Sequence, residues 1–244
     1  SQQLTLITQA EESTLPEQKK SLTFAEKRKK LSEKKKKKKA KSPSQPQLSS
    51  LLEHYQNGRY GDAEKLALSM TKQFPRHQFS WKVLGAVLQE TGRISEALAA
   101  IQKSVALAPE DAEAHSNLGN TLRDLGRLKE AEASCRQAIS LKPGFPEAHS
   151  NLGITLRDLG RLEEAEASYR KAIALKPDYA EAHNNLGVTL RDLGRSKDAE
   201  ASYRKAIALK SDYAEAHSNL GTSLQDLGRL EEAEASYRKA IALK

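Results

Sequence analysis

One unit of 34 residues is repeated along most of this 244-residue chain, and no other feature constrains the fold as strongly. A Gly-Arg pair marks every copy, with the glycines at Gly58, Gly92, Gly126, Gly160, Gly194 and Gly228. Repeats of this length form solenoids, in which each unit packs on its neighbours and the stack presents an extended surface. Such a surface is typical of binding, so we expect a protein that is not an enzyme.

Each unit contains two apolar stretches at helical spacing, one on either side of the Gly-Arg turn. In the fifth unit, His183, Leu186 and Leu190 lie three to four positions apart, as on one face of an amphipathic helix. The turn glycine suits the end of the first helix, where a left-handed backbone favours glycine. Asp178 and Glu181 predict a capping box that opens this helix. The units are expected near residues 44–77, 78–111, 112–145, 146–179, 180–213 and 214–244.

Basic residues are concentrated before the repeats. Residues 1–50 hold thirteen Lys and Arg against five Asp and Glu, a net charge of +8 that equals the charge of the whole chain. The run Lys34 to Lys39 repels itself and has little apolar surface to bury, so we expect residues 1–47 to form a disordered Lys-rich tail. This tail is either a weak binder of polyanions, such as nucleic acid or an anionic membrane, or a solvated spacer.

The repeated pattern resembles the tetratricopeptide repeat (TPR), which has large residues, Leu-Gly, alanines and a proline at fixed positions. The second unit supplies Trp81, Leu84, Gly85, Leu88, Ala97 and Pro109. The fourth unit supplies Leu152, Gly153, Leu156, Ala165, Tyr169, Ala172 and Pro177. The resemblance covers about residues 48–244. It implies an all-α TPR superhelix, an α-α solenoid of five clear 34-residue repeats plus a degenerate N-terminal one.

The resemblance also implies a binding face, because the first helix of each TPR unit lines the concave groove. Polar residues recur at the positions that would face a ligand. The predicted groove residues are Asn117, Asn151, Asn185, Asn219, Arg123, Arg157, Arg191, Asp124, Asp158 and Asp192. An asparagine amide both donates and accepts, so it can pair with a peptide backbone whatever its side chains. The row of asparagines resembles the ladder in the TPR arm of O-GlcNAc transferases, which holds protein substrates.

A structural interpretation of the asparagines stays open beside the ladder. The fourth and fifth units share 27 of their 34 residues, so an asparagine can recur simply because the unit was duplicated. It would then form a hydrogen bond within its own helix pair.

Other kinds of site are not supported. The single cysteine, Cys135, allows neither a disulfide nor a cysteine-based zinc site, and we expect it to be a packed core thiol. One histidine per unit cannot place several ligands around one metal ion. No cofactor motif and no apolar run of membrane-spanning length occurs in the sequence, so we expect a cytoplasmic protein, or a nuclear one in a eukaryote.

Three functions remain. The first is a scaffold that binds an extended protein or peptide segment in the groove. The second is the substrate-recognition arm of a glycosyltransferase-like enzyme whose catalytic domain lies beyond Lys244. The third is a scaffold tethered to nucleic acid or an anionic membrane by its tail. The last unit stops without its closing proline, so we also expect either a longer protein or self-association through the uncovered last helix.

Overall fold

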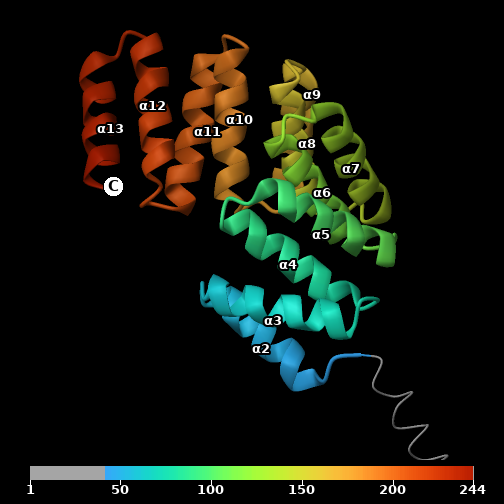
Figure 1. The fold of residues 1–244 in the computed structure, drawn as a ribbon. Helices are drawn as coiled ribbons and strands as arrows, with labels where there is room; N and C mark the ends of the chain where they lie inside the picture. Colours follow the sequence, from blue (N-terminus) through green and yellow to red (C-terminus); the bar gives the residue numbers. More distant parts are fainter. Residues whose placement is uncertain (1–41, 244) are drawn as a thin grey trace, which may run out of the picture. The chain divides into compact units, whose positions relative to one another are not determined.

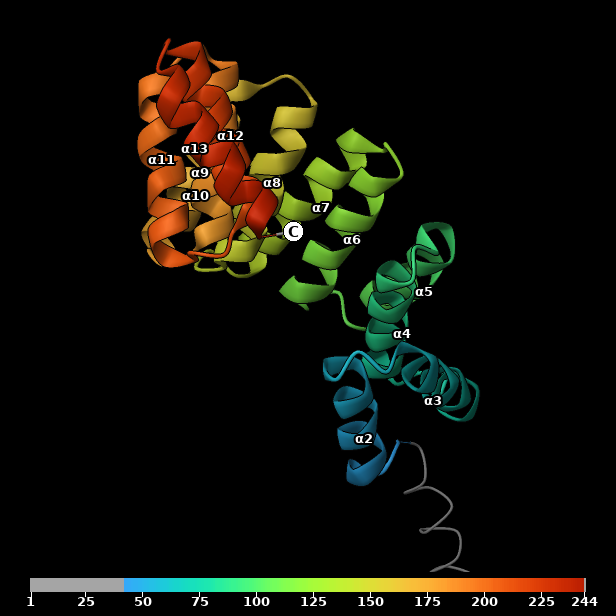
Figure 2. The same cartoon turned by 90° about the vertical axis from the view of Figure 1, so that its left-hand side faces the viewer.

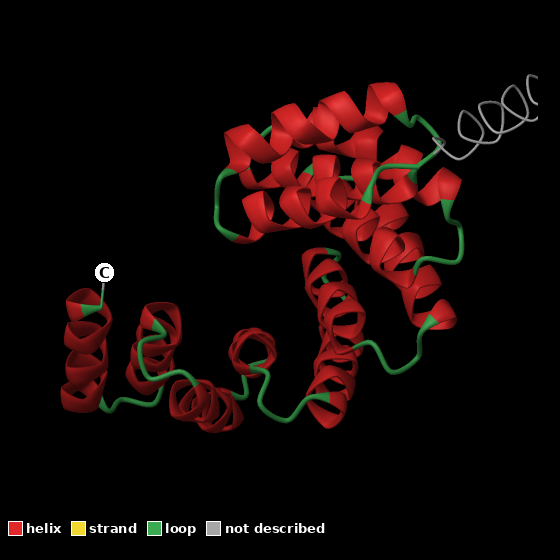
Figure 3. Ribbon diagram, turned by 90° about the horizontal axis from the view of Figure 1, so that it is seen from below, coloured by secondary structure: helices red, strands yellow, loops and turns green. Residues whose placement is uncertain are grey.

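The computed structural model describes residues 42–243. In this range twelve α-helices follow one another through short loops, with no strand between them (Figure 1, Figure 3). The helices are α2 (Gln45–Gln56), α3 (Tyr60–Gln73), α4 (Gln78–Glu90), α5 (Ile94–Leu107), α6 (Ala112–Asp124), α7 (Leu128–Leu141), α8 (Pro146–Asp158), α9 (Leu162–Leu175), α10 (Ala180–Asp192), α11 (Ser196–Leu209), α12 (Ala214–Asp226) and α13 (Leu230–Ala242). The predicted all-α solenoid of helix pairs is confirmed. The tail predicted for residues 1–47 lies, up to residue 41, outside the described residues.

The first helix begins earlier than residue 48. The side chain of Gln47 accepts hydrogen bonds from the backbone amide of Ser44 at 2.9 Å and from its hydroxyl at 3.0 Å, which closes the start of α2. Pro46 lies in the first turn of this helix, where a missing backbone amide costs nothing. The helical part of the chain therefore begins before residue 48 and includes Pro46.

Each first helix ends at the glycine of the Gly-Arg turn, as predicted. Gly194 has a φ of 74°, and its amide donates to the carbonyl of Arg191 at 2.8 Å. The amide of the next residue, Arg195, donates to the carbonyl of Leu190 at 2.9 Å. These bonds satisfy carbonyl groups that the end of a helix leaves free. The turn thus redirects the chain into the second helix of the same repeat.

The capping box predicted from Asp178 and Glu181 is wrong. The residue that precedes the first turn of α10 is Tyr179, and no side chain caps this helix end. Asp178 stands one residue too early in the sequence to reach the free amides. In the third unit Asp111 stands directly before α6, and its carboxylate accepts two backbone amides of that helix at 2.9 and 3.1 Å. Position, and not spacing to a glutamate, decides which aspartate caps.

Tyrosine rings and glycines hold the two helices of a pair together. A Cβ atom added to Gly187 on α10 would lie 2.6 Å from Cε1 of Tyr203 on α11, so only glycine leaves room for this ring. Tyr203 and Tyr169 are 0% exposed. They belong to an apolar cluster that runs without a break through several repeats. The core is therefore shared between neighbouring units, and each repeat packs against the next (Figure 2).

Candidate functional site

The first helices of successive repeats lie against one another. Cα atoms come within 8 Å between α2 and α4, α4 and α6, α6 and α8, α8 and α10, and α10 and α12. Between residues 42 and 243, no such contact joins the second helices of successive repeats. The stack is closer together on the side of the first helices, so these helices form its inner face. We call this surface, made by α2, α4, α6, α8, α10 and α12, the inner face.

A polar pocket of about 410 Å³ opens on the inner face where three repeats meet. Three predicted groove residues, Asn117, Arg123 and Asp124, line it from α6. The remaining lining residues are Tyr55 on α2, Ala86, Gln89 and Glu90 on α4, and Asn120 on α6. The pocket thus collects polar side chains from three helices that are far apart in the sequence.

Four of these lining residues, Tyr55, Gln89, Glu90 and Asn120, were not singled out from the sequence. They occupy repeat positions that face the groove in TPR units, but they do not recur from unit to unit, apart from Gln89, whose position in the last unit is occupied by Gln225. Ile154 and Val188, for example, stand where the third unit has Asn120. Their position in the repeat could have identified them as groove residues, whereas the prediction favours residues that recur from unit to unit.

The asparagine row divides into two kinds of residue. The side-chain amides of Asn151 and Asn219 donate to the preceding first helix, to Ser116 Oγ and Asn184 Oδ1, each at 3.0 Å. Within residues 42–243, the side chains of Asn117 and Asn185 have no hydrogen-bond partner, although both are half-buried. The bonded asparagines join neighbouring repeats and not the two helices of one pair. The unbonded asparagines keep all their donors and acceptors for a ligand.

On the inner face, each predicted arginine pairs with the aspartate that follows it in the sequence. Arg123 Nη2 lies 2.7 Å from Asp124 Oδ1, and the corresponding distances for Arg157–Asp158 and Arg191–Asp192 are 3.7 and 3.9 Å. All six side chains are partly exposed. Partly exposed pairs of this kind contribute little to stability, so a charged group of a ligand can replace either member of a pair at a small cost in free energy.

Comparison with sequence families supports the same repeat units. The family described as "Tetratricopeptide repeat" matches residues 82–146, 134–167 and 214–244, and the one described as "TPR repeat" matches residues 153–194 and 187–228. The chain belongs to the tetratricopeptide repeat family. A search of the curated proteins finds no match to this TPR chain.

Several solved structures share the TPR fold. MamA is 26% identical with a TM-score of 0.57, and the alignment covers 66% of this chain and 94% of MamA. PilW, described as a type IV pilus biogenesis factor, is 21% identical with a TM-score of 0.75 over 82% of this chain and 94% of PilW. YrrB, described as a TPR protein with an unusual peptide-binding site, is 20% identical with a TM-score of 0.54, covering 73% and 92% of the two chains. The last two likenesses show the fold alone.

The histidines and the cysteine of the TPR units make contacts that suit a structural role. Nε2 of His183 lies 3.1 Å from the carbonyl oxygen of Pro177, and His115 and His149 make the same contact with the prolines six residues before them. Cys135 is 0% exposed, and burial raises the pKa of its thiol to about 11. From residue 42 to residue 243, no group of three or more acidic, histidine or cysteine side chains could hold a metal ion, and no helix could cross a membrane.

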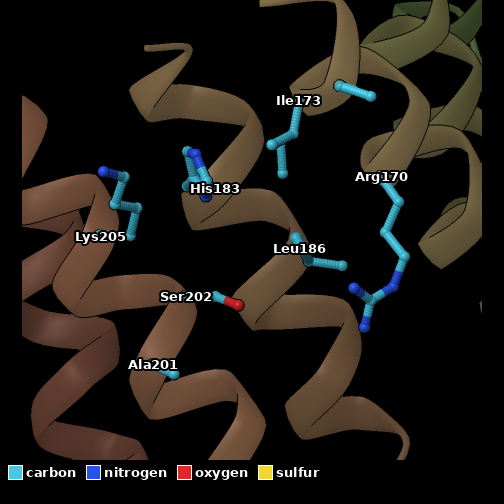
Figure 4. Close-up of a pocket in the computed structure, with 8 residues that line it drawn as sticks. Arg170, Ile173, His183, Leu186, Ala201, Ser202 and Lys205 are labelled. Carbon is cyan, nitrogen blue, oxygen red and sulfur yellow. The ribbon is translucent and has the colours of Figure 1, made fainter. Parts of the chain in front are cut away.

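A second pocket lies away from the inner face, over α10 and between α9 and α11 (Figure 4). It measures about 390 Å³, and Ile173, His183 and Leu186 form its apolar part. Arg170 and Lys205 flank it from the two second helices. In the part of the chain that the structure describes, no carboxylate and no side-chain amide lines this second pocket.

Proposed function

We propose that this TPR protein is a non-enzymatic scaffold that binds an extended segment of a partner protein along its inner face. The observation that carries the proposal is the polar pocket, where the unbonded amide of Asn117 lies with Gln89 and Asn120. Such amides offer donors and acceptors at fixed places and suit the backbone of an extended chain. YrrB, a TPR protein with an unusual peptide-binding site, is an example of this use of the fold and supports the proposal.

The test is selection from a library of random peptides on the immobilised full chain. Asn117→Ala and Asn185→Ala remove amides that have no partner in residues 42–243, so both variants should fold normally. We expect each to weaken the selected peptides about tenfold, the loss of one or two hydrogen bonds. Asn151 and Asn219 are poorer choices, because their loss also removes bonds between repeats.

Gln137→Ala is the matched control, since it removes an exposed amide from the second helix α7. Its affinity should equal that of the original protein. If no peptide is retained, the scaffold proposal fails. If peptides are retained and Asn117→Ala and Asn185→Ala bind as well as Gln137→Ala, peptides bind elsewhere.

Two further roles are proposed as alternatives. The asparagine row favours a substrate-recognition arm of a transferase; a gene product of the source organism without a catalytic domain would contradict it. The second alternative is that Lys34 to Lys39, which lie outside the described residues, tether the scaffold to nucleic acid or an anionic membrane. It predicts polyanion binding that is abolished by replacing these lysines with serine.

Self-association is proposed for the last helix. Leu230 and Ile241 on α13 are 65% and 73% exposed. The equivalents of Ile241 in earlier repeats, Ile139, Ile173 and Ile207, pack against the core. A second copy would remove this apolar surface from water. Sedimentation of the full chain should show a dimer that Ile241→Lys converts to a monomer; a monomer at all concentrations would contradict it.

A further inference from the structure

Negative charge is concentrated on the inner face. In TPR units, positions 2, 5, 6, 9, 12 and 13 of the 34 face the groove. At these positions of the six units there are nine carboxylates and four basic side chains. The carboxylates are Glu90, Glu113, Glu147, Glu181, Glu215, Asp124, Asp158, Asp192 and Asp226, and the basic residues are Lys82, Arg123, Arg157 and Arg191. Residues 51–244 as a whole are neutral, with 27 basic and 27 acidic residues. The excess on the inner face is therefore a local feature and not a consequence of overall composition.

Some of this charge is already neutralised. Each arginine of the face lies beside the aspartate that follows it, and Lys82 contacts both Asp111 and Glu113. In the described part of the chain, Glu90, Glu181 and Asp226 have no basic partner. These three are spread from the second repeat to the last. Part of the negative charge along the face therefore has no compensating side chain among the described residues.

The pocket is the point where this charge meets unused hydrogen-bonding groups. Glu90 enters it from α4 with Gln89, while Asn117 and Asn120 face it from α6. The ring of Tyr55 closes a third side. Burial, and next the charge of Glu90, raise the pKa of Tyr55. Arg123, the only basic residue of the lining, is engaged by Asp124 at 2.7 Å.

We propose that the partner segment is basic, and that one of its lysine or arginine side chains enters this pocket and pairs with Glu90. The inference rests on the proposed function and names the chemistry of its ligand. The carboxylate of Glu90 is exposed at the pocket, and a charge-assisted hydrogen bond to it is stronger than a neutral one. Amide oxygens of the neighbouring side chains can accept the remaining donors of an ammonium or guanidinium group. The aromatic ring adds a surface on which a cation can lie.

The charge along the rest of the face extends the preference beyond one side chain. Complementary charge steers a basic segment to the face and repels an acidic one. Salt screens this effect, and at 0.1 M salt the interaction between charges falls off over a distance of about 10 Å. The same charge disfavours nucleic acid as a ligand of this face, because phosphates would meet an excess of carboxylates. The partner is therefore a protein with a Lys- or Arg-rich extended stretch.

The experiment measures fluorescence anisotropy of a labelled 12-residue peptide of alternating arginine and serine on the full chain. A second peptide carries glutamate in place of each arginine. We expect the arginine peptide to bind and the glutamate peptide not to bind. Glu90→Gln should raise the Kd of the arginine peptide about tenfold. Glu163→Gln, which removes an exposed carboxylate without a partner from the second helix α9, should change it less than about twofold.

Two results would overturn the inference directly: equal binding of both peptides, or equal weakening by the two variants. If the arginine peptide binds only after Lys34 to Lys39 are changed to serine, the basic occupant is the chain's own segment, and a partner protein is excluded. If random-library selection yields peptides without an excess of basic residues, the scaffold function survives and this inference fails. If the library yields no peptide at all, both fail.

Discussion

Tyrosine side chains fill the space between paired helices, and two of them do so without using their hydroxyl groups. Tyr169 and Tyr203 are 0% exposed, and neither hydroxyl has a hydrogen-bond partner among the residues that the structure describes. Burial raises the pKa of both well above the usual range. Tyr237 in the last repeat differs, because its hydroxyl lies 3.2 Å from Thr222 Oγ1 and from Gln225 Oε1. The tyrosine rings stabilise the helix pairs by packing, whereas the buried hydroxyl groups lower the stability of the fold.

Tyr203→Phe is therefore expected to increase the free energy of unfolding by about 1 kcal/mol, since it removes a buried polar group that has no partner. Urea unfolding followed by circular dichroism measures the change. Tyr237→Phe is the matched control and should lower stability slightly, because that hydroxyl has partners. A loss of stability in Tyr203→Phe as large as in the control would show that the buried hydroxyl is hydrogen-bonded.

Cys135 occupies the tyrosine position of the third repeat and should behave as an apolar group. Its thiol is fully buried and its pKa is raised to about 11, so almost no thiolate exists at pH 8. We expect Ellman's reagent to label the native protein at pH 8 far more slowly than the protein in 8 M urea. Rapid labelling of the native protein would mean that the helix pair opens locally.

At the scale of the helix pair, glycines have two separate tasks. Gly187 makes room for the ring of Tyr203 on the neighbouring helix, whereas Gly194 adopts a φ of 74° with no atom near its missing Cβ. One glycine is required by packing and the other by backbone conformation. The two tasks predict different responses to the same substitution.

Gly187→Ala should destabilise the protein by about 1–3 kcal/mol, because the new methyl group overlaps the Tyr203 ring. Combining it with Tyr203→Leu should recover part of the loss, which a double-mutant cycle in urea would measure. Additive effects of the two substitutions would show that the ring is not what the methyl group meets.

Gly194→Ala should cost about 1 kcal/mol for the left-handed backbone alone. Gly194→Asn should cost less, since asparagine tolerates this conformation. Neither variant should interact with Tyr203→Leu, so this turn glycine serves as the control for the packing glycine.

At the scale of the whole molecule, four of the turn arginines connect successive repeats: Arg93, Arg161, Arg195 and Arg229. Nη1 of Arg161 lies 2.6 Å from Glu132 of the preceding repeat, and Nη2 lies 2.6 Å from Glu164 of its own repeat. Arg229 bridges Glu200 and Glu232 in the same way, at 2.7 and 2.5 Å. The Gly-Arg pair therefore combines a turn with a connection between units.

These pairs predict how stability depends on pH. Hydrogen bonds from the turn arginines lower the pKa of Glu96, Glu130, Glu164 and Glu232. Because the folded pKa lies below the unfolded value of about 4.3, their contribution is complete above that value and is lost as the pH falls through the folded pKa. We expect the Tm to stay nearly constant from pH 7 to pH 5 and to fall at lower pH.

Thermal unfolding between pH 7 and pH 3 measures this dependence. Glu164→Gln should make the fall at acid pH shallower, and added salt should do the same. Glu163→Gln, whose carboxylate has no partner in the described chain, is the control and should leave the profile unchanged. A fall equally steep in Glu164→Gln and in the control would show that other groups cause it.

Much of the fold could be predicted because the repeat carries its own signals. Apolar spacing gave the helices, and Gly194 and its equivalents gave their ends, since left-handed backbone strongly favours one residue type. Capping was predicted less well: Asp178 has the right spacing to Glu181, but Tyr179 occupies the capping position. A shift of one residue decides whether a side chain reaches a free amide, and spacing alone does not register it.

The sequence by itself determined the repeat and the helix pairs, because short-range periodicity fixes them, and its resemblance to the TPR family implied which positions form the inner face. Only the tertiary structure decided which polar groups on that face are free. Asn151 and Asn117 occupy the same repeat position, yet one amide is bonded to the adjacent helix and the other is not. Their difference depends on the residue at the facing position of the preceding repeat and on the distance between the helices. Those are contacts between residues about 35 apart, which no local pattern in the sequence encodes.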